Sequence, residues 1–303
     1  MNKKMIYPFV LTFASGLLLG LGSLGTIDYT VKRAKKEKNN IDKYISPDDL
    51  NWINHQSFEE LEINSFDGLL LKAKLLKTSH DSDKVVVAIH GYRMNNLKEY
   101  GKYLKFYHDL GFHILLPDNR AHGQSEGKYI GFGWLDRLDC IQWIYKIKKY
   151  FNKPLQIVLH GISMGSATVL MASGEKLPND VKCIISDCGY SSMIEEVQYV
   201  VKQTPFPNFI VKPATWLSKY RAGYNFKEAS TIQQIKKSKT PTLFIHGDKD
   251  DFVPTNMVYD LYEVCPCQKE LLIVEGANHA ESYSVNPELY KKTVTSFIQQ
   301  FVK

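Results

Sequence analysis

Residues 155–172, LQIVLHGISMGSATVLMA, decide the fold. The first five of them form a short apolar run of strand length that directly follows Pro154. A Gly-Ile-Ser-Met-Gly turn comes next, and residues 166–173 mix small side chains with Leu, Val and Met, a composition that favours a helix. The stretch therefore predicts a buried strand that turns sharply into a helix, with Ser163 at the apex of the turn.

Glycine stands two residues before Ser163 and two residues after it. A serine held on such a strained turn needs neighbours without side chains, because the chain must pass close to itself and to the sheet. The first backbone N–H groups of the helix that follows Ser163 have no partner within the helix, so they can donate hydrogen bonds to a developing negative charge. G-x-S-x-G also occurs by chance in Gly-rich loops, but the strand before it and the helix after it favour a nucleophile elbow.

Length and composition are those of a globular protein. The 303 residues suit one large α/β domain or two small ones, and 44% hydrophobic and 23% charged residues are ordinary values. The net charge of +6 is concentrated in the first forty residues, which hold seven basic and two acidic side chains. The remainder is nearly neutral and gives no sign of the basic face that a nucleic-acid-binding protein needs, so we predict no nucleic-acid partner.

The five cysteines are odd in number and fit neither a disulfide framework nor a zinc spacing. We therefore expect no metal site. Cys265 and Cys267, separated by one proline, would form a redox pair or, as we favour, two unrelated thiols in a loop.

Residues 5–27 carry no charge and are long enough to cross a bilayer of about 30 Å. We expect an uncleaved single-pass anchor in the cell membrane, with a cleaved secretory signal as the alternative. The basic residues at 32–38 favour a cytoplasmic C-terminal domain, whereas the Lys-Lys start is typical of an exported protein, so the side of the membrane stays open. We divide the chain into an anchor with a charged spacer (1–40) and a folded domain (41–303).

Strand and helix patterns alternate from residue 84 to the end of the chain. Short β-branched or apolar runs predict strands buried on both faces at 84–90, 112–116, 155–159, 181–186, 241–246 and 270–274. Helices are expected at 46–54, 95–110, 134–150, 166–173 and 287–302, and a hairpin over 58–77. The alternation predicts a doubly wound, mostly parallel sheet of about eight strands. The alternation of strand and helix patterns is interrupted over about 189–237, where abundant Pro and aromatic residues predict a mostly helical lid.

A serine hydroxyl needs an adjacent base that is oriented by a third group. If the chain order is Ser, acid, His, the base is His279, which follows the last strand in a loop with small residues. His90, His160 and His246 each end a buried strand directly before a glycine and are expected to shape the strand ends. We expect His122 to organise its own loop by hydrogen bonds.

The acid should follow the strand at 241–246, where the loop offers three aspartates. Asp250, four residues before Pro254, is the favoured candidate. Asp248 is the second candidate, because it could instead hold the turn, and Asp251 is the third.

An oxyanion formed at Ser163 needs two donors. We predict the backbone N–H of Met164, which follows the serine, and that of Tyr92, in the turn after the strand at 84–90. The alternative for Tyr92 is a side chain that only lines the pocket.

Several motifs together resemble the α/β-hydrolase superfamily from about residue 61 to the C-terminus. They are His90-Gly91, Asp118-x-Arg120-x-His122-Gly123-x-Ser125, Gly161-x-Ser163-x-Gly165, Gly247-x-x-Asp250-x-x-Val253-Pro254 and His279. In particular, the chain looks like the N-terminally anchored, serine-peptidase-like α/β hydrolases of bacteria.

The resemblance implies an α/β-hydrolase fold, a Ser163–Asp250–His279 triad, no cofactor, and cleavage of an ester, thioester or amide through an acyl-enzyme. We favour a carboxylesterase-like enzyme that acts on a small acyl substrate. A peptidase or amidase with the same triad is the alternative, although the chain has no room for the propeller domain of oligopeptidases. A binding protein on a hydrolase fold that has lost its activity is a third interpretation. The physiological substrate and the oligomeric state stay open.

Overall fold

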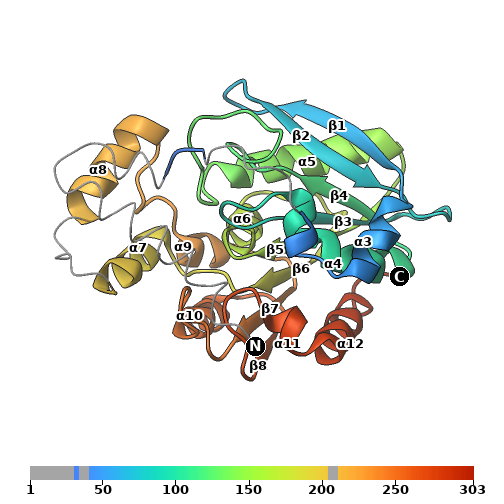
Figure 1. The fold of residues 1–303 in the computed structure, drawn as a ribbon. Coiled ribbons are helices and arrows are strands. Elements are labelled where there is room, and N and C mark those ends of the chain that lie inside the picture. Colours follow the sequence, from blue (N-terminus) through green and yellow to red (C-terminus); the bar gives the residue numbers. More distant parts are fainter. Residues whose placement is uncertain (1–30, 34–40, 204–210) are drawn as a thin grey trace.

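The computed structural model describes residues 31–33, 41–203 and 211–303 (Figure 1). The predicted anchor at 5–27 and most of the charged spacer lie outside these residues. Among the residues described, no helix combines the length and the apolar character needed to cross a bilayer.

The centre of the fold is one eight-stranded sheet in the order β1-β2-β4-β3-β5-β6-β7-β8. β1 and β2 form the predicted hairpin, and β2 also pairs antiparallel with β4. All later neighbours pair in parallel. The strands are β1 (Phe58–Asn64), β2 (Leu70–Leu76), β3 (Lys84–Ile89), β4 (His113–Pro117), β5 (Gln156–Ile162), β6 (Val181–Asp187), β7 (Thr242–Gly247) and β8 (Lys269–Val274).

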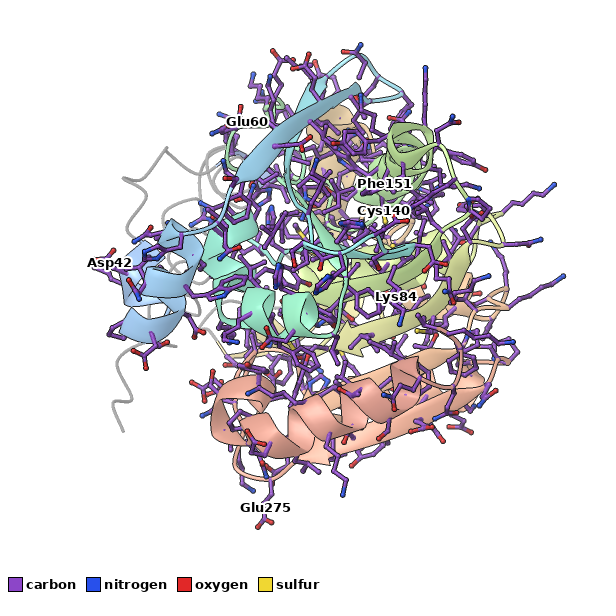
Figure 2. The ribbon with its side chains drawn as sticks, turned by 90° about the vertical axis from the view of Figure 1, so that its right-hand side faces the viewer. Asp42, Glu60, Lys84, Cys140, Phe151 and Glu275 are labelled. Carbon is purple, nitrogen blue, oxygen red and sulfur yellow. The ribbon has the colours of Figure 1, made fainter. Side chains whose placement is uncertain are left out.

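The two edges of the sheet lie far apart. Figure 2 labels Glu60 on β1 and Glu275 just after β8, and these residues stand at opposite sides of the molecule. The central strands β3, β4 and β7 are buried along almost their whole length, because helices cover both of their faces. This explains why the strand runs of the sequence show no polar alternation.

Helices cover both faces of the sheet (Figure 1). One face packs against α3 (Pro47–Asn54), α4 (Asn96–Asp109) and α12 (Pro287–Ile298), and α11 (Ser282–Val285) lies beside α12. The other face packs against α5 (Asp136–Phe151), α6 (Met164–Ser173) and α10 (Asn256–Val264). A short 3₁₀ helix, η1 (Ile41–Lys43), precedes α3. The predicted mostly parallel sheet with two helical layers is confirmed.

Several element bounds differ from the sequence prediction. α6 begins at Met164, two residues earlier than expected, because the helix starts directly after the strained serine. α12 ends at Ile298 rather than at residue 302. α10, between β7 and β8, was not predicted, although the alternation of strands and helices requires an element there.

The predicted lid segment contains α7 (Met193–Lys202), α8 (Val211–Ala222) and α9 (Thr231–Ile235). Figure 1 shows α7 and α8 at the end of the molecule opposite α3 and α12. Buried side chains of α7 share an apolar cluster with Tyr92 and Met164, the two residues predicted to hold an oxyanion. We call α7, α8 and α9 the cap, and the loops that follow the parallel strands the floor of the site.

Candidate active site

Ser163 occupies a sharp turn between β5 and α6. Its backbone has φ +56° and ψ −118°, a conformation that costs a non-glycine residue free energy and that clusters at functional sites. A Cβ on Gly161 would lie 2.2 Å from the carbonyl oxygen of Gly165, and one on Gly165 would lie 1.8 Å from that of Ile89. Both glycines are therefore required by the close passage of the chain, as the sequence predicted.

Three side chains from distant parts of the sequence meet at this turn. His279 Nε2 lies 2.8 Å from Ser163 Oγ, and His279 Nδ1 lies 2.8 Å from Asp250 Oδ2. Ser163 follows β5, Asp250 follows β7 and His279 follows β8, so all three stand where parallel strands end. This edge of an open α/β sheet is where such folds place ligands. The arrangement can pass a proton between a hydroxyl and an imidazole.

The Asp250 carboxylate is fully buried and fully hydrogen-bonded. Its Oδ1 accepts the backbone N–H groups of Phe252 and Val253, at 3.0 and 2.9 Å. Its Oδ2 faces His279 and, at 3.2 Å, the Nε2 of His246. Burial alone would raise the pKa of this carboxyl, but the two imidazoles hold it well below its usual range. Asp250 therefore stays ionised and can orient His279.

His279 differs electrostatically from the other buried histidines. Burial lowers its pKa, but the negative charge of Asp250 outweighs burial, and the pKa is raised well above its usual value. Burial lowers the pKa values of His90, His122 and His160 to about 4, 3 and 3, so these imidazoles are neutral at pH 7. His279 is therefore the strongest imidazole base of these four.

The neutral histidines hold the ends of the strands and their loops. His90 Nε2 accepts the backbone N–H of Asn119, and His122 Nε2 accepts that of Arg93. His160 lies between the hydroxyls of Tyr107 and Tyr290. The contacts of His90 and His122 agree with the predicted structural roles. His160 does not end its strand as predicted, because β5 continues to Ile162, and its imidazole is held inside the core by tyrosine hydroxyls.

The two other aspartates of the β7 loop do not reach His279. Asp248 accepts the backbone N–H of Gly276 and pairs with Lys249, so it ties the β7 loop to the β8 loop. Asp251 is exposed, and its carbonyl oxygen accepts a hydrogen bond from Gln203. The geometry thus brings together Asp250, rather than Asp248 or Asp251, with the histidine.

The turn after β3 lies directly against the serine. A Cβ placed on Gly91 would be 3.3 Å from Ser163 Cβ, and Tyr92 is the next residue. Met164 is the first residue of α6, where backbone N–H groups have no partner within the helix. The two predicted oxyanion donors therefore belong to segments that flank Ser163.

Two buried groups of the site were not predicted from the sequence. Glu99 of α4 accepts the backbone N–H of Gly91 at 3.1 Å, and burial raises the pKa of its carboxyl. Cys188 follows β6 with a positive φ of 45°, and its thiol interacts with His279. The rule that functional residues follow parallel strands could have identified Cys188, whereas nothing local marks Glu99 within a helix.

The side chains of Cys188, Asp250 and His279 offer ligand atoms within 4.8 Å of one another, and they form the only such group of three or more in the described part of the chain. Both ring nitrogens of His279 already face Asp250 and Ser163. A metal would have to displace one of these contacts, so the arrangement suits proton transfer better than metal binding.

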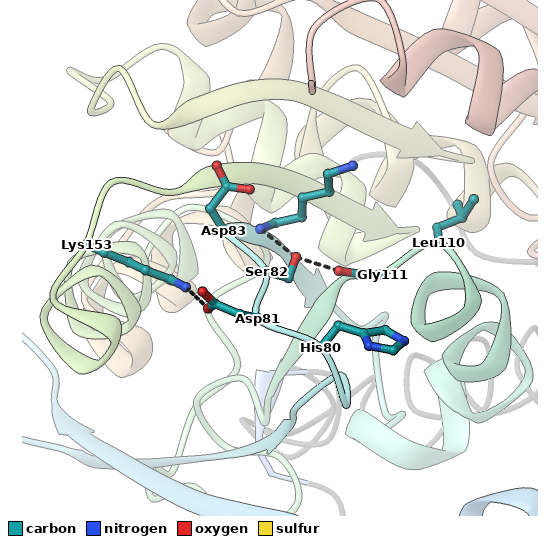
Figure 3. A pocket seen from close by; sticks show the side chains of 8 residues that line it. His80, Asp81, Ser82, Asp83, Leu110, Gly111 and Lys153 are labelled. Atoms are coloured by element: carbon teal, nitrogen blue, oxygen red, sulfur yellow. Dashed lines mark hydrogen bonds and ion pairs between the residues drawn. The ribbon is translucent and has the colours of Figure 1, made fainter.

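A hollow at the opposite end of the strands has a different character (Figure 3). It measures about 420 Å³ and lies where β3 begins, between Ser82, Gly111 and Lys153. Lys153 pairs there with Asp81, whose side chain is 96% exposed. This hollow is therefore separate from the site around Ser163, at the other end of the sheet.

A mostly parallel eight-stranded sheet, with a strained serine between strand and helix and a histidine and an aspartate on later strand ends, defines an α/β hydrolase. The model of the prolyl oligopeptidase family matches residues 103–303, and the chain belongs to that family. It is thus a hydrolase of the α/β fold.

The chain is also similar to a bacterial relative in sequence and to solved structures in fold. The Bacillus subtilis protein YqkD is 33% identical over 250 residues, which cover 80% of this chain and 81% of YqkD. The Pyrococcus furiosus esterase Pf2001 shares the fold with a TM-score of 0.70 at 23% identity, over 90% of this chain and 99% of the esterase. The Pyrococcus horikoshii acylaminoacyl peptidase matches with a TM-score of 0.59 at 19% identity, over 82% of this chain and 42% of the peptidase.

Proposed function

We propose that this protein is a serine hydrolase that cleaves a carboxylic ester or thioester through an acyl-enzyme, with Ser163, His279 and Asp250 as its triad. The observation that carries the proposal is the continuous hydrogen-bonded chain from Ser163 Oγ through His279 to Asp250, with 2.8 Å at both links. Neither membership of the family nor the fold names the substrate.

In the proposed reaction, His279 Nε2 takes the proton of Ser163 as Oγ attacks the acyl carbon. Asp250 holds Nδ1–H toward itself and stabilises the imidazolium that forms. His279 then gives the proton to the departing alcohol or thiol. A water molecule repeats the sequence on the acyl-enzyme, releases the acid and restores Ser163.

Negative charge develops on the acyl oxygen during both attacks. The backbone N–H groups of Met164 and Tyr92 are the proposed donors for this oxygen, since both residues flank Ser163. Donors fixed before the reaction stabilise the transition state without reorganisation, and losing one typically costs about 10²–10³ in kcat. Glu99 supports this arrangement by holding the N–H of Gly91, one residue before Tyr92.

The most informative experiment compares p-nitrophenyl esters of short and long acyl chains with peptide p-nitroanilides, using the full-length chain in mild detergent. We expect hydrolysis of the esters by the wild type and loss of hydrolysis in Ser163→Ala. Turnover of the peptides alone would replace the proposed esterase activity by a peptidase activity on the same triad.

That peptidase or amidase activity is the second candidate. It is favoured by the match to the prolyl oligopeptidase family and by the fold shared with an acylaminoacyl peptidase. This chain spans less than half of that peptidase, so the comparison concerns only the part that matches.

We further propose that residues 5–27 anchor the protein in a membrane, ahead of a catalytic domain at 41–303. The support is the uncharged run of the sequence and the basic residues that follow it. Protease treatment of intact cells tests the anchor and its orientation, since an externally facing domain is cut and a cytoplasmic one is protected. Recovery of the full-length chain in the soluble fraction would contradict anchoring.

A further inference from the structure

Glu196 occupies a position where the helical pattern calls for an apolar residue. α7 buries Met193, Val197, Val200 and Val201 on the face that packs toward the site, and Glu196 lies on the same face with 4% exposure. Its neighbour Glu195 is exposed and accepts a hydrogen bond from Ser191. The two adjacent glutamates therefore have opposite environments on one helix.

The Glu196 carboxyl is buried without a partner. Neither Oε1 nor Oε2 has a hydrogen-bond partner among the residues described. Leaving a buried polar group unpaired costs about 1–3 kcal/mol, and more if it is charged. A group that is expensive to bury in the empty protein gains most from a ligand that satisfies it.

The face of α7 that carries Glu196 packs in one cluster with Tyr92 and Met164, the residues that flank Ser163. The charged groups that act on the Glu196 carboxyl, within the described part of the chain, are His279 and Asp250. Burial is the largest influence and raises the pKa of Glu196 well above its usual value, so the empty site holds a neutral acid. The surrounding cluster is apolar and partly aromatic, and it includes Tyr92, Tyr190 and Phe252.

We propose that Glu196 forms a subsite for a primary ammonium group on the acyl part of the substrate. The inference rests on the proposed function, since it assigns a substrate class to the same site. An ammonium presents three N–H donors and a positive charge, and so satisfies both carboxylate oxygens at once. Its binding favours the ionised carboxylate, and nearby aromatic faces also attract cations.

The test measures kcat/KM for matched pairs of p-nitrophenyl esters, corrected for spontaneous hydrolysis. The pairs are alanyl against propanoyl and 6-aminohexanoyl against hexanoyl, so that the amine stands near the acyl carbon or far from it. The full-length wild type is compared with Glu196→Gln, which keeps the shape and removes the charge. Glu195→Gln is the matched control on the exposed side of the same helix.

We expect the wild type to prefer the amine in at least one pair by tenfold or more. That ratio should fall by at least tenfold in Glu196→Gln, mainly through KM, and stay within twofold in Glu195→Gln. Equal hydrolysis of amine and alkyl esters by the wild type, or an equal ratio in Glu196→Gln, would overturn the subsite while leaving the hydrolase intact. Failure of every ester, together with failure of a fluorophosphonate probe to label Ser163, would instead overturn the proposed function and the subsite with it.

Discussion

Asp250 on the floor of the site and Glu196 on the cap are both buried carboxyls, but their hydrogen-bonding environments are opposite. On the floor, Asp250 has four hydrogen-bonding neighbours, and His90 and His122 are held by backbone groups of adjacent loops. On the cap, Glu196 is equally buried but has no partner among the described residues. The Asp250 carboxylate is therefore already satisfied by protein groups, whereas the Glu196 carboxyl is the group that we propose a substrate to satisfy.

The largest effect should follow from damage to the floor. Asp250→Asn should lower kcat by about 10⁴-fold, because the amide no longer fixes the tautomer of His279. Asp248→Asn, on the same loop, should change kcat by less than about threefold, since Asp248 only ties two loops together. Steady-state kinetics on a p-nitrophenyl ester measures both. The reverse result would assign the acid to Asp248.

A glycine in the first turn of α6, next to the serine, should tolerate a side chain far less than the glycine that directly follows α8. Gly165→Ala should destabilise the fold by about 3 kcal/mol or more, because its Cβ would lie 1.8 Å from the carbonyl oxygen of Ile89. Gly223 has open space around it, so Gly223→Ala should lower the free energy of unfolding by only about 1 kcal/mol, because of the positive φ of 82°. Urea denaturation gives both free energies of unfolding, and similar values would contradict the difference in packing.

The Glu196 carboxyl, which has no partner within the described ranges, should reduce the stability of the protein without substrate. Glu196→Leu should raise the free energy of unfolding by about 1–3 kcal/mol, because the buried polar group is removed. Glu195→Leu, on the exposed side, should change it by less than about 0.5 kcal/mol. Thermal unfolding compares the two variants. Destabilisation by Glu196→Leu would indicate that Glu196 has a partner in solution.

The pH dependence should reveal the charge of Asp250. His279 must lose its proton to act as a base, and Asp250 raises the pKa of that imidazole. Below this pKa, the rate of inactivation by a fluorophosphonate should rise about tenfold for each pH unit. Asp250→Asn removes the negative charge and so lowers the pKa of His279. The inflexion of the pH–rate curve should therefore move to lower pH in this variant, although its inactivation rates are much smaller. An unchanged inflexion would mean that another group titrates.

The sequence predicted most of the floor. The spacing of Gly161, Ser163 and Gly165 is typical of a close-packed turn. The buried strands indicate where functional side chains lie, because these follow the strand ends. His279 and Asp250 could be selected because chain order and strand ends restrict the candidates to one loop each. His90 and His122 were recognisable for the same reason, since they lie directly after β3 and in the loop after β4, whereas His160 lies inside β5.

The cap and the deeper supports were less predictable. Glu196 and Glu195 are adjacent, and only the packing of α7 decides which of them is buried. Glu99 reaches Gly91 from a helix that precedes β4, a contact that depends on tertiary structure. Cys188 directly follows β6, so its place at the edge of the sheet follows from the strand-end rule, but its contact with His279 depends on its backbone conformation. Contacts of this kind leave no local pattern.

The central claim is that Ser163 is the nucleophile. The full-length chain should be treated with a fluorophosphonate probe, digested and analysed by mass spectrometry, with Ser163→Ala alongside. We predict a single modified peptide that carries the probe on Ser163, and no labelling of the variant. Equal labelling of both proteins, or modification at another serine, would contradict the account.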